Sequence, residues 1–141
     1  MKTVSDIMKQ ALANGACDKS KGVSDWKTLC WLFFTPQGIE FCTENNFPTL
    51  DVFEEIKNKV SDFGIFVNSG EITHSNDSNI ALVGDTNGKL VYDDNTKVHK
   101  VILMHGAKAF IVARNYAVVR LICSDDCEVN IHRDKTAVIL R

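Results

Sequence analysis

The stretch AKAFIVARNYAVVRLICSDDCEVNIHRDKTAVILR, residues 107–141, decides the fold because its pattern recurs every ten residues. The first position of each unit is small: Ala107, Ala117, Cys127 and Ala137. Two positions later stand Ala109, Val119, Val129 and Ile139, and four positions later Ile111, Leu121, Ile131 and finally Arg141. This alternation is the period-2 pattern of a strand with one buried face.

Polar residues separate these units and supply the turns, at Asn115 and in segments 124–126 and 133–135. Units stacked at a fixed period predict either a β-meander or a short β-solenoid. Both arrangements need small residues where strands or layers pack closely, so the pattern leaves the two open. In either case we expect the four small residues to point inward.

The region before the repeat also reads as strands, because β-branched residues and short segments dominate it from about residue 63. The expected strands are 65–67, 71–74, 80–83, 89–92 and 98–105. Asn87-Gly88 is a typical hairpin dipeptide and predicts a tight turn between two of them.

Residues 1–62 predict a helical head of about four short helices. The apolar residues recur at helical spacing within segments 4–14, 24–34, 36–46 and 49–60. Capping residues mark the helix starts: Thr3 or Ser5, Ser24, Thr35 before Pro36, and Thr49 after Pro48. The sequence therefore predicts an α+β protein, with a helical head (1–62) and a repetitive β region (63–141) in one structural unit without a flexible linker.

Composition excludes several classes of protein. The chain has 141 residues, of which 45% are hydrophobic and 24% charged, as in globular domains rather than disordered ones. Its net charge of −2 and lack of a basic run argue against a nucleic-acid partner. The start lacks a signal-peptide pattern, and no apolar run approaches the ~20 residues that span a bilayer. We therefore expect a cytoplasmic protein that does not bind membranes.

The cysteines and histidines form no diagnostic motif for catalysis or metal binding. Five cysteines, an odd number without scaffold spacing, favour free thiols in a reducing compartment. Cys123 and Cys127 flank a turn, but a structural zinc site needs four ligands and no second cysteine pair exists. The acidic turns lack calcium-loop spacing, and glycine-rich phosphate loops are missing. We expect no catalytic residue, no metal and no cofactor.

Four residues are candidates for an interaction surface: Trp31, Thr136, Val138 and Leu140. Trp31 lies well round the helix from Trp26 and Phe33, so it faces a different layer or a partner. The last strand, 136–140, carries flanking charges but no interrupting charge or proline, so its edge favours pairing with another copy.

These observations favour a non-catalytic interaction or assembly protein that forms a homo-oligomer or binds a protein partner. The alternative is a small enzyme or ligand-binding domain, with a pocket between the helical head and the first strands that uses His99, His105 or a cysteine.

Three segments also resemble a known group of proteins: FFTPQGIEFCTENNFP (33–48), FGIFVNSGEI (63–72) and VILMHGAKAFIVARNYAVV (101–119). They resemble uncharacterised small proteins of Bacteroides-type gut bacteria and their phages or prophages. The resemblance covers about residues 33–140 and implies a short helical head followed by a β-repeat, with a mobile-element or phage origin. It implies no activity and no site residue.

The repeat register can be tested by enlarging one of its small residues. Ala117→Leu adds volume where strands pack closely, so we expect a loss of about 1–3 kcal/mol in unfolding free energy. Urea unfolding of the variant and the parent measures the difference. A variant as stable as the parent would show that the register is wrong.

Overall fold

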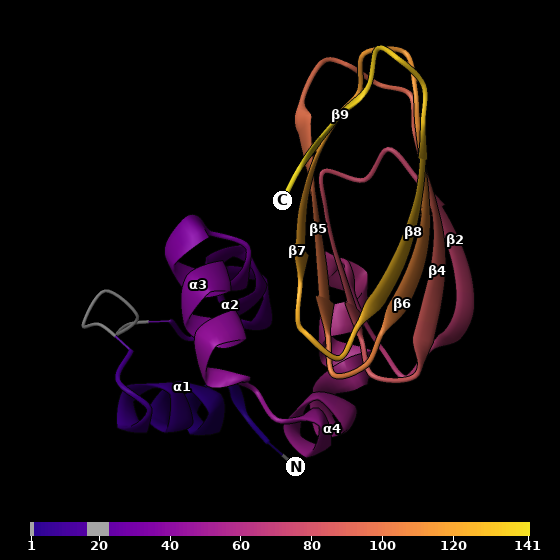
Figure 1. The fold of residues 1–141 in the computed structure, drawn as a ribbon. Helices are drawn as coiled ribbons and strands as arrows, with labels where there is room; N and C mark the ends of the chain where they lie inside the picture. The colour runs from indigo at the N-terminus through magenta and orange to yellow at the C-terminus, as the bar shows by residue number, and fades with distance from the viewer. Residues whose placement is uncertain (1, 17–22) are drawn as a thin grey trace. The chain divides into compact units, whose positions relative to one another are not determined.

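The computed structural model describes residues 2–16 and 23–141, and these divide into two compact units, Met1–Ile65 and Phe66–Arg141. The first unit is helical and the second is built from strands (Figure 1). The α+β class, with helices first and a β-repeat after them, is confirmed.

Within the described residues, the helical unit contains four α-helices and one short 3-10 helix. Their bounds are α1 Val4–Ala13, α2 Trp26–Phe33, α3 Pro36–Asn45, α4 Leu50–Val60 and η2 Ser61–Phe63. In each α-helix the side chain of the residue before it accepts a hydrogen bond from a backbone amide in the first turn; these residues are Thr3, Asp25, Thr35 and Thr49.

The predicted caps are confirmed at Thr3, Thr35 and Thr49, whereas the prediction of Ser24 is wrong by one residue. The Asp25 carboxylate accepts the Thr28 amide at 2.6 Å. A charged acceptor makes a stronger bond than a hydroxyl and also favours the positive end of the helix dipole.

Aromatic contacts hold part of the helical unit together. The ring of Phe33 in α2 meets that of Phe34 edge-on, with centroids 5.2 Å apart, and that of Phe53 in α4 at 6.4 Å. Aromatic pairs in this geometry contribute about 0.5–1.5 kcal/mol beyond their buried area. They therefore fix α2 against α4.

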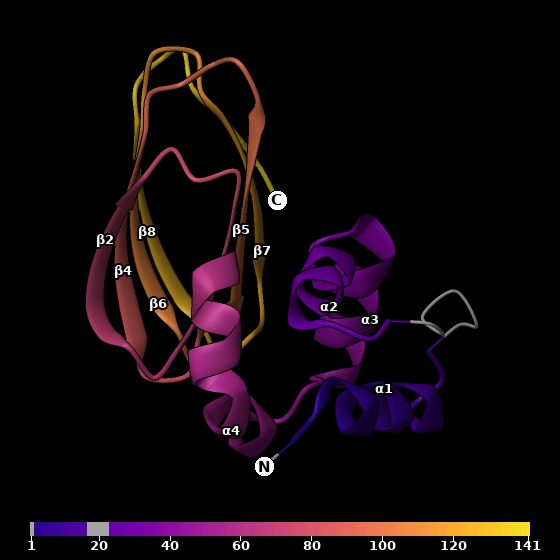
Figure 2. The same cartoon turned by 180° about the vertical axis from the view of Figure 1, so that it is seen from behind.

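The second unit is a β-solenoid of parallel strands. The strands after β1 (Ile65–Val67) are β2 Gly70–Ser75, β3 Asn79–Val83, β4 Thr86–Tyr92, β5 Val98–Met104, β6 Lys108–Ala113, β7 Val118–Cys123, β8 Glu128–Arg133 and β9 Val138–Leu140. One sheet has the order β1-β3-β5-β7-β9 and the other β2-β4-β6-β8. The two sheets face each other in both views (Figures 1 and 2).

The strand register explains the ten-residue repeat. Val101 pairs with Leu121, and Ala109 with Val129, so partners stand 121 − 101 = 20 and 129 − 109 = 20 positions apart. One full turn is therefore two repeat units, and successive units lie in opposite sheets. All the pairs between consecutive turns are parallel, which decides for the solenoid over the meander.

The space between the sheets is filled by one apolar core. Ala107, Ala117 and Ala137 are fully buried in it, so the inward orientation of these small residues is confirmed. Cys127, the fourth member of the series, packs against the core but is only half-buried. Small side chains recur here because each stands just before a strand, where the chain turns from one sheet into the other.

The hairpin predicted at Asn87-Gly88 is wrong, because both residues lie inside β4. A Cβ atom on Gly88 would stand 2.6 Å from a methyl carbon of Leu82. The glycine thus makes room for a large core side chain and does not serve a turn. The strand predicted at 98–105 ends at Met104, since His105 adopts a left-handed φ of 56°.

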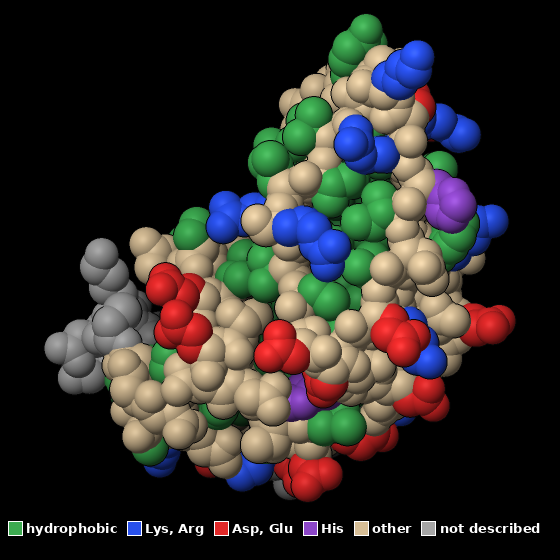
Figure 3. Space-filling model, in the orientation of Figure 1, with side chains coloured by type: hydrophobic (Ala, Val, Ile, Leu, Met, Phe, Trp, Pro, Cys, Tyr) green, Lys and Arg blue, Asp and Glu red, His purple; other side chains and the backbone are tan. Residues whose placement is uncertain are grey.

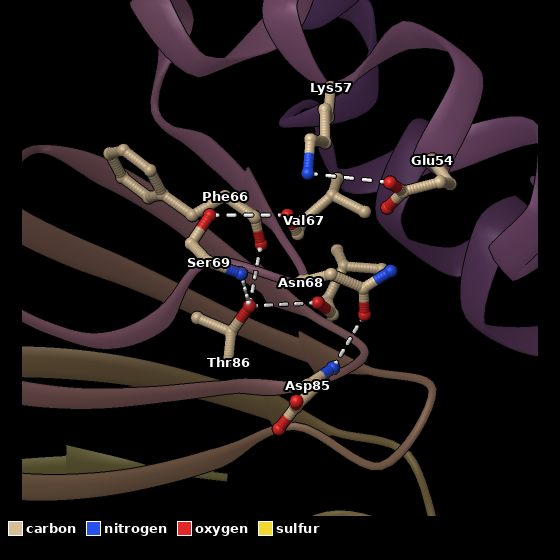
Figure 4. A network of polar contacts seen from close by, with 9 residues as sticks. Glu54, Lys57, Phe66, Val67, Asn68, Ser69, Asp85 and Thr86 are labelled. Carbon is tan, nitrogen blue, oxygen red and sulfur yellow. Dashed lines mark hydrogen bonds and ion pairs between the residues drawn. The ribbon is translucent and has the colours of Figure 1, made fainter.

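Side chains satisfy the backbone where the solenoid bends. Asn68, with a φ of 46°, accepts the Asp85 amide through its Oδ1 at 2.7 Å. The buried Thr86 hydroxyl accepts the Ser69 amide at 3.0 Å and donates to the Val83 carbonyl at 2.9 Å (Figure 4). This hydroxyl therefore joins the segment after β1 to the segment after β3, one turn later.

The Thr86 hydroxyl can be deleted without loss of shape. Thr86→Val leaves the Ser69 amide and the Val83 carbonyl without this partner, so we expect a loss of about 1–3 kcal/mol in unfolding free energy. Thr86→Ser keeps the hydroxyl and is the matched control. Equal stability of the two variants in urea unfolding would contradict a role for this hydrogen bond.

Candidate functional site: the open end of the solenoid

The strands β8 and β9 are the last of their sheets, and within the described residues no strand lies beyond either of them. The Val138 amide donates to the Ala117 carbonyl at 3.0 Å, and the Glu128 amide donates to the Ala107 carbonyl at 3.2 Å. Because successive amides of a strand point to opposite sides, the next amides along, those of Ile139 and Val129, point away from their sheets. Among the residues that the structure describes, both strands therefore present open backbone edges.

The inward-facing side chains of this last turn are less covered than those one turn earlier. Val129, Ile131 and Ile139 are half-buried, whereas their register partners Ala109, Ile111 and Val119 are fully buried. The difference arises because each turn of a solenoid covers the one before it. Figure 3 shows hydrophobic side chains gathered on the face where β8 and β9 lie nearest the viewer, with basic side chains beside them.

The exposed side chains of β9 extend this apolar surface. Val138 and Leu140 are 45% and 49% exposed on the outer face of the sheet. Thr136 is half-buried, and its hydroxyl accepts the Tyr116 amide at 2.9 Å and donates to Asp134 at 2.6 Å. Thr136 therefore stabilises the turn before β9, whereas the side chains of Val138 and Leu140 are exposed to solvent.

Trp31, the remaining predicted surface residue, belongs to the helical unit. It is 67% exposed on α2, as its angular offset from Phe33 predicts. The structure thus brings Thr136, Val138 and Leu140 together in one segment, with Trp31 in the other unit.

The sequence-based list of surface residues omitted β8. Val129 and Ile131 were assigned to the inward phase of the repeat, and inward residues are ordinarily core. Their exposure depends on their position in the stack. Val129 and Ile131 lie in the last described turn, and no following turn in the described residues covers them. Tyr116, 64% exposed in the turn before β7, was also omitted.

The Asp134 carboxylate organises the turn that leads into β9. Its Oδ1 accepts the amides of Thr136 at 2.8 Å and Ala137 at 3.1 Å, in addition to the Thr136 hydroxyl. Hydrogen bonds from the Thr136 hydroxyl and amide lower the pKa of Asp134 to about 2. The turn is therefore stabilised by the ionised carboxylate.

The described cysteines are poor nucleophiles. Burial raises the pKa of Cys30 and of Cys42 to about 12 and that of Cys127 to about 11, and burial also raises the pKa of Cys123. The thiolate is the form that attacks or binds metal efficiently, so these thiols react slowly at neutral pH. Cys17 lies outside the described residues.

The histidines stand in separate places. His99 is fully buried, and its Nδ1 and Nε2 lie 3.0 and 2.9 Å from the carbonyl oxygens of Asp77 and Asp94. Since a carbonyl can only accept, the ring nitrogen that carries the hydrogen donates to one of these two carbonyls, and the tautomer decides which. His74 pairs with Asp77 at 2.8 Å, and His132 stacks on Phe110 with ring centroids 4.8 Å apart.

The described part of the chain meets neither the requirements of a metal site nor those of a membrane-spanning helix. Across residues 2–16 and 23–141, no three His, Cys, Asp or Glu side chains lie together as a metal site would require. Within the same residues, no helix combines the length and the apolar character needed to cross a bilayer.

Comparison with family models gives no match, and comparisons with curated proteins and with solved structures give none either. The resemblance to proteins of Bacteroides-type bacteria and their phages therefore stays a prediction.

The role of Asp134 predicts a dependence of stability on pH. Its pKa is near 2 when folded and 3.8 ordinarily, so its contribution is present above about pH 4 and is lost as the pH falls toward 2. Asp134→Asn removes this term. Urea unfolding between pH 2 and 5 should give a smaller fall in stability for the variant, and parallel profiles would contradict the assignment.

Proposed function

We propose that this protein is a non-catalytic assembly module that pairs with a second copy of itself through the open end of its solenoid. The observation that carries the proposal is the coincidence of two open backbone edges with half-buried core side chains in the same turn. Such edges are normally paired, covered or charged in proteins that stay monomeric.

The pattern of side chains on β8 favours an antiparallel copy related by a two-fold axis. If the two-fold axis passes through Asn130, Val129 pairs with Ile131 of the copy. Glu128 then pairs with His132 of the copy. The outward-pointing amides then belong to Val129 and Ile131, which exchange both hydrogen bonds, as an antiparallel pair requires. Apolar side chains meet between the sheets, and an acidic residue meets a basic one outside them.

The edge of β9 carries a self-complementary pattern of the same kind. In an antiparallel pair centred on Ile139, Val138 lies across from Leu140 of the copy, so two exposed apolar side chains cover each other. An interface in which one patch meets itself is the ordinary design of two-fold dimers. A second copy of the chain therefore offers each edge a partner of matching pattern.

A lysine at the edge tests the proposal against a matched control. Val138 and Val98 share one column of the sheet through Val118, and they are 45% and 50% exposed. Val138→Lys places a charge in the proposed interface and should weaken dimerisation at least about tenfold, whereas Val98→Lys, in mid-sheet, should leave it unchanged.

Sedimentation or light scattering over a concentration series, with and without a chelator, gives the measurement, and circular dichroism checks that both variants fold. We expect the parent chain to dimerise equally in both buffers. A parent that stays monomeric at all concentrations, or equal behaviour of the two variants, would overturn the proposal.

A further inference from the structure

The helices of the first unit surround a cavity of about 630 Å³. Pockets that take small molecules have volumes of roughly 300–1,000 Å³, so the size suits such a ligand. Each of the four helices contributes apolar side chains to the wall, among them Met8 of α1, Leu29 of α2, Phe41 of α3 and Ile56 of α4. The cavity belongs to the helical unit, whereas the open edges of β8 and β9 belong to the β unit.

The inner wall of the cavity carries no charge. Its two buried cysteines, Cys30 and Cys42, are neutral thiols at pH 7 because burial raises the pKa of each to about 12. Around them lie aromatic and aliphatic side chains, including Phe33 and Phe53. An ionised group placed against this wall would lose its hydration without compensation. The wall therefore selects an apolar body.

Among the residues that the structure describes, the charged side chains that line the cavity are both acidic. Glu40 and Glu44 stand one turn apart on α3, and no lysine, arginine or histidine of residues 2–16 and 23–141 lines the cavity with them. Neither carboxylate forms an ion pair within residues 2–16 and 23–141. Two like charges at this spacing repel each other, and Glu44 also lies at the negative end of the helix dipole. The described residues at this place therefore favour a positively charged group.

Trp31 lines the same cavity with most of its side chain exposed. Tryptophan is highly buried on average, so a tryptophan that is 67% exposed stands out. The face of an indole ring attracts cations within about 6 Å, most strongly those that are weakly hydrated. Trp31 and the two carboxylates therefore favour the same kind of group.

We propose that the cavity binds a small amphipathic cation, a molecule with an apolar body and one amine or quaternary ammonium head. The body fills the uncharged wall, and the head lies at the mouth with Glu40, Glu44 and Trp31. This binding is independent of assembly, since the residues that carry it lie in the helical unit.

Three probes with the same ten-carbon chain test the charge preference: decyltrimethylammonium, 1-decanol and decanoate, each below its aggregation concentration. Calorimetric titration should show that the cation binds at least about tenfold more tightly than decanoate, with decanol between them. Raising the salt concentration should lower the binding affinity of the cation and leave that of decanol unchanged. Equal affinities for the cation and decanoate, or no binding of any probe, would overturn the proposal.

Removal of the two carboxylates tests the mouth of the cavity. The double variant Glu40→Gln/Glu44→Gln should bind the cation about five- to tenfold more weakly and bind decanol with unchanged affinity. Glu55→Gln/Asp62→Asn removes the same charge from exposed positions that do not line the cavity and should change neither. Equal effects of the two double variants would mean that net charge, not the site, attracts the cation.

Two further measurements locate the bound probe. Leu29→Trp narrows the cavity and should abolish binding of both decanol and the cation. Independently of whether that variant folds, bound cation should slow alkylation of Cys30 and Cys42 relative to Cys123, as measured by peptide mass spectrometry. Unchanged alkylation at saturating probe would overturn the site. Repeating the titration in Val138→Lys separates binding from assembly, because we expect the same affinity there.

Discussion

Parallel hydrogen bonding between each strand and the strand one turn earlier is the constraint on which the β unit depends. The free N–H and C=O groups at the edge of each turn form hydrogen bonds with the strands of the next turn. The backbone of a strand is therefore fully hydrogen-bonded only when another turn stacks on it. Within the described residues, the same rule leaves the turn of β8 and β9 without a following turn. The open edges of β8 and β9 and the half-buried Val129, Ile131 and Ile139 follow directly from the way the rest of the unit is held together.

This constraint also explains which residues recur at the bends. A chain that passes from one sheet to the other every ten residues needs small side chains before each strand and left-handed backbone in several turns. Ala107 and Ala117 meet the first need, and Asn76 and Asn115, with φ of 58° and 59°, meet the second. Asparagine tolerates this conformation and bonds the neighbouring turn, as Asn76 does with the Asp93 amide at 2.9 Å.

Sequence reasoning found what depends on local pattern and missed what depends on pairing. The helix starts at Thr3, Thr35 and Thr49 and the inward phase of the alanines are local, and they were predicted correctly. Parallel pairing was left open because a ten-residue unit suits a meander equally well. Gly88 was misread as a turn residue, since its role depends on Leu82, which no local pattern places beside it. The exposure of β8 was missed for the same reason.

The two apolar surfaces differ in what they can recognise. The edges of β8 and β9 carry amides and carbonyls at fixed spacing, and only another extended backbone offers matching partners along its length. The backbone around the helical cavity is already hydrogen-bonded within helices. A ligand is therefore selected there by its shape and its charge. An edge of the first kind favours a polypeptide, and a cavity of the second kind with carboxylates and Trp31 at its mouth favours a small cation. The two proposals therefore rest on different chemistry in different units, and one can fail without the other.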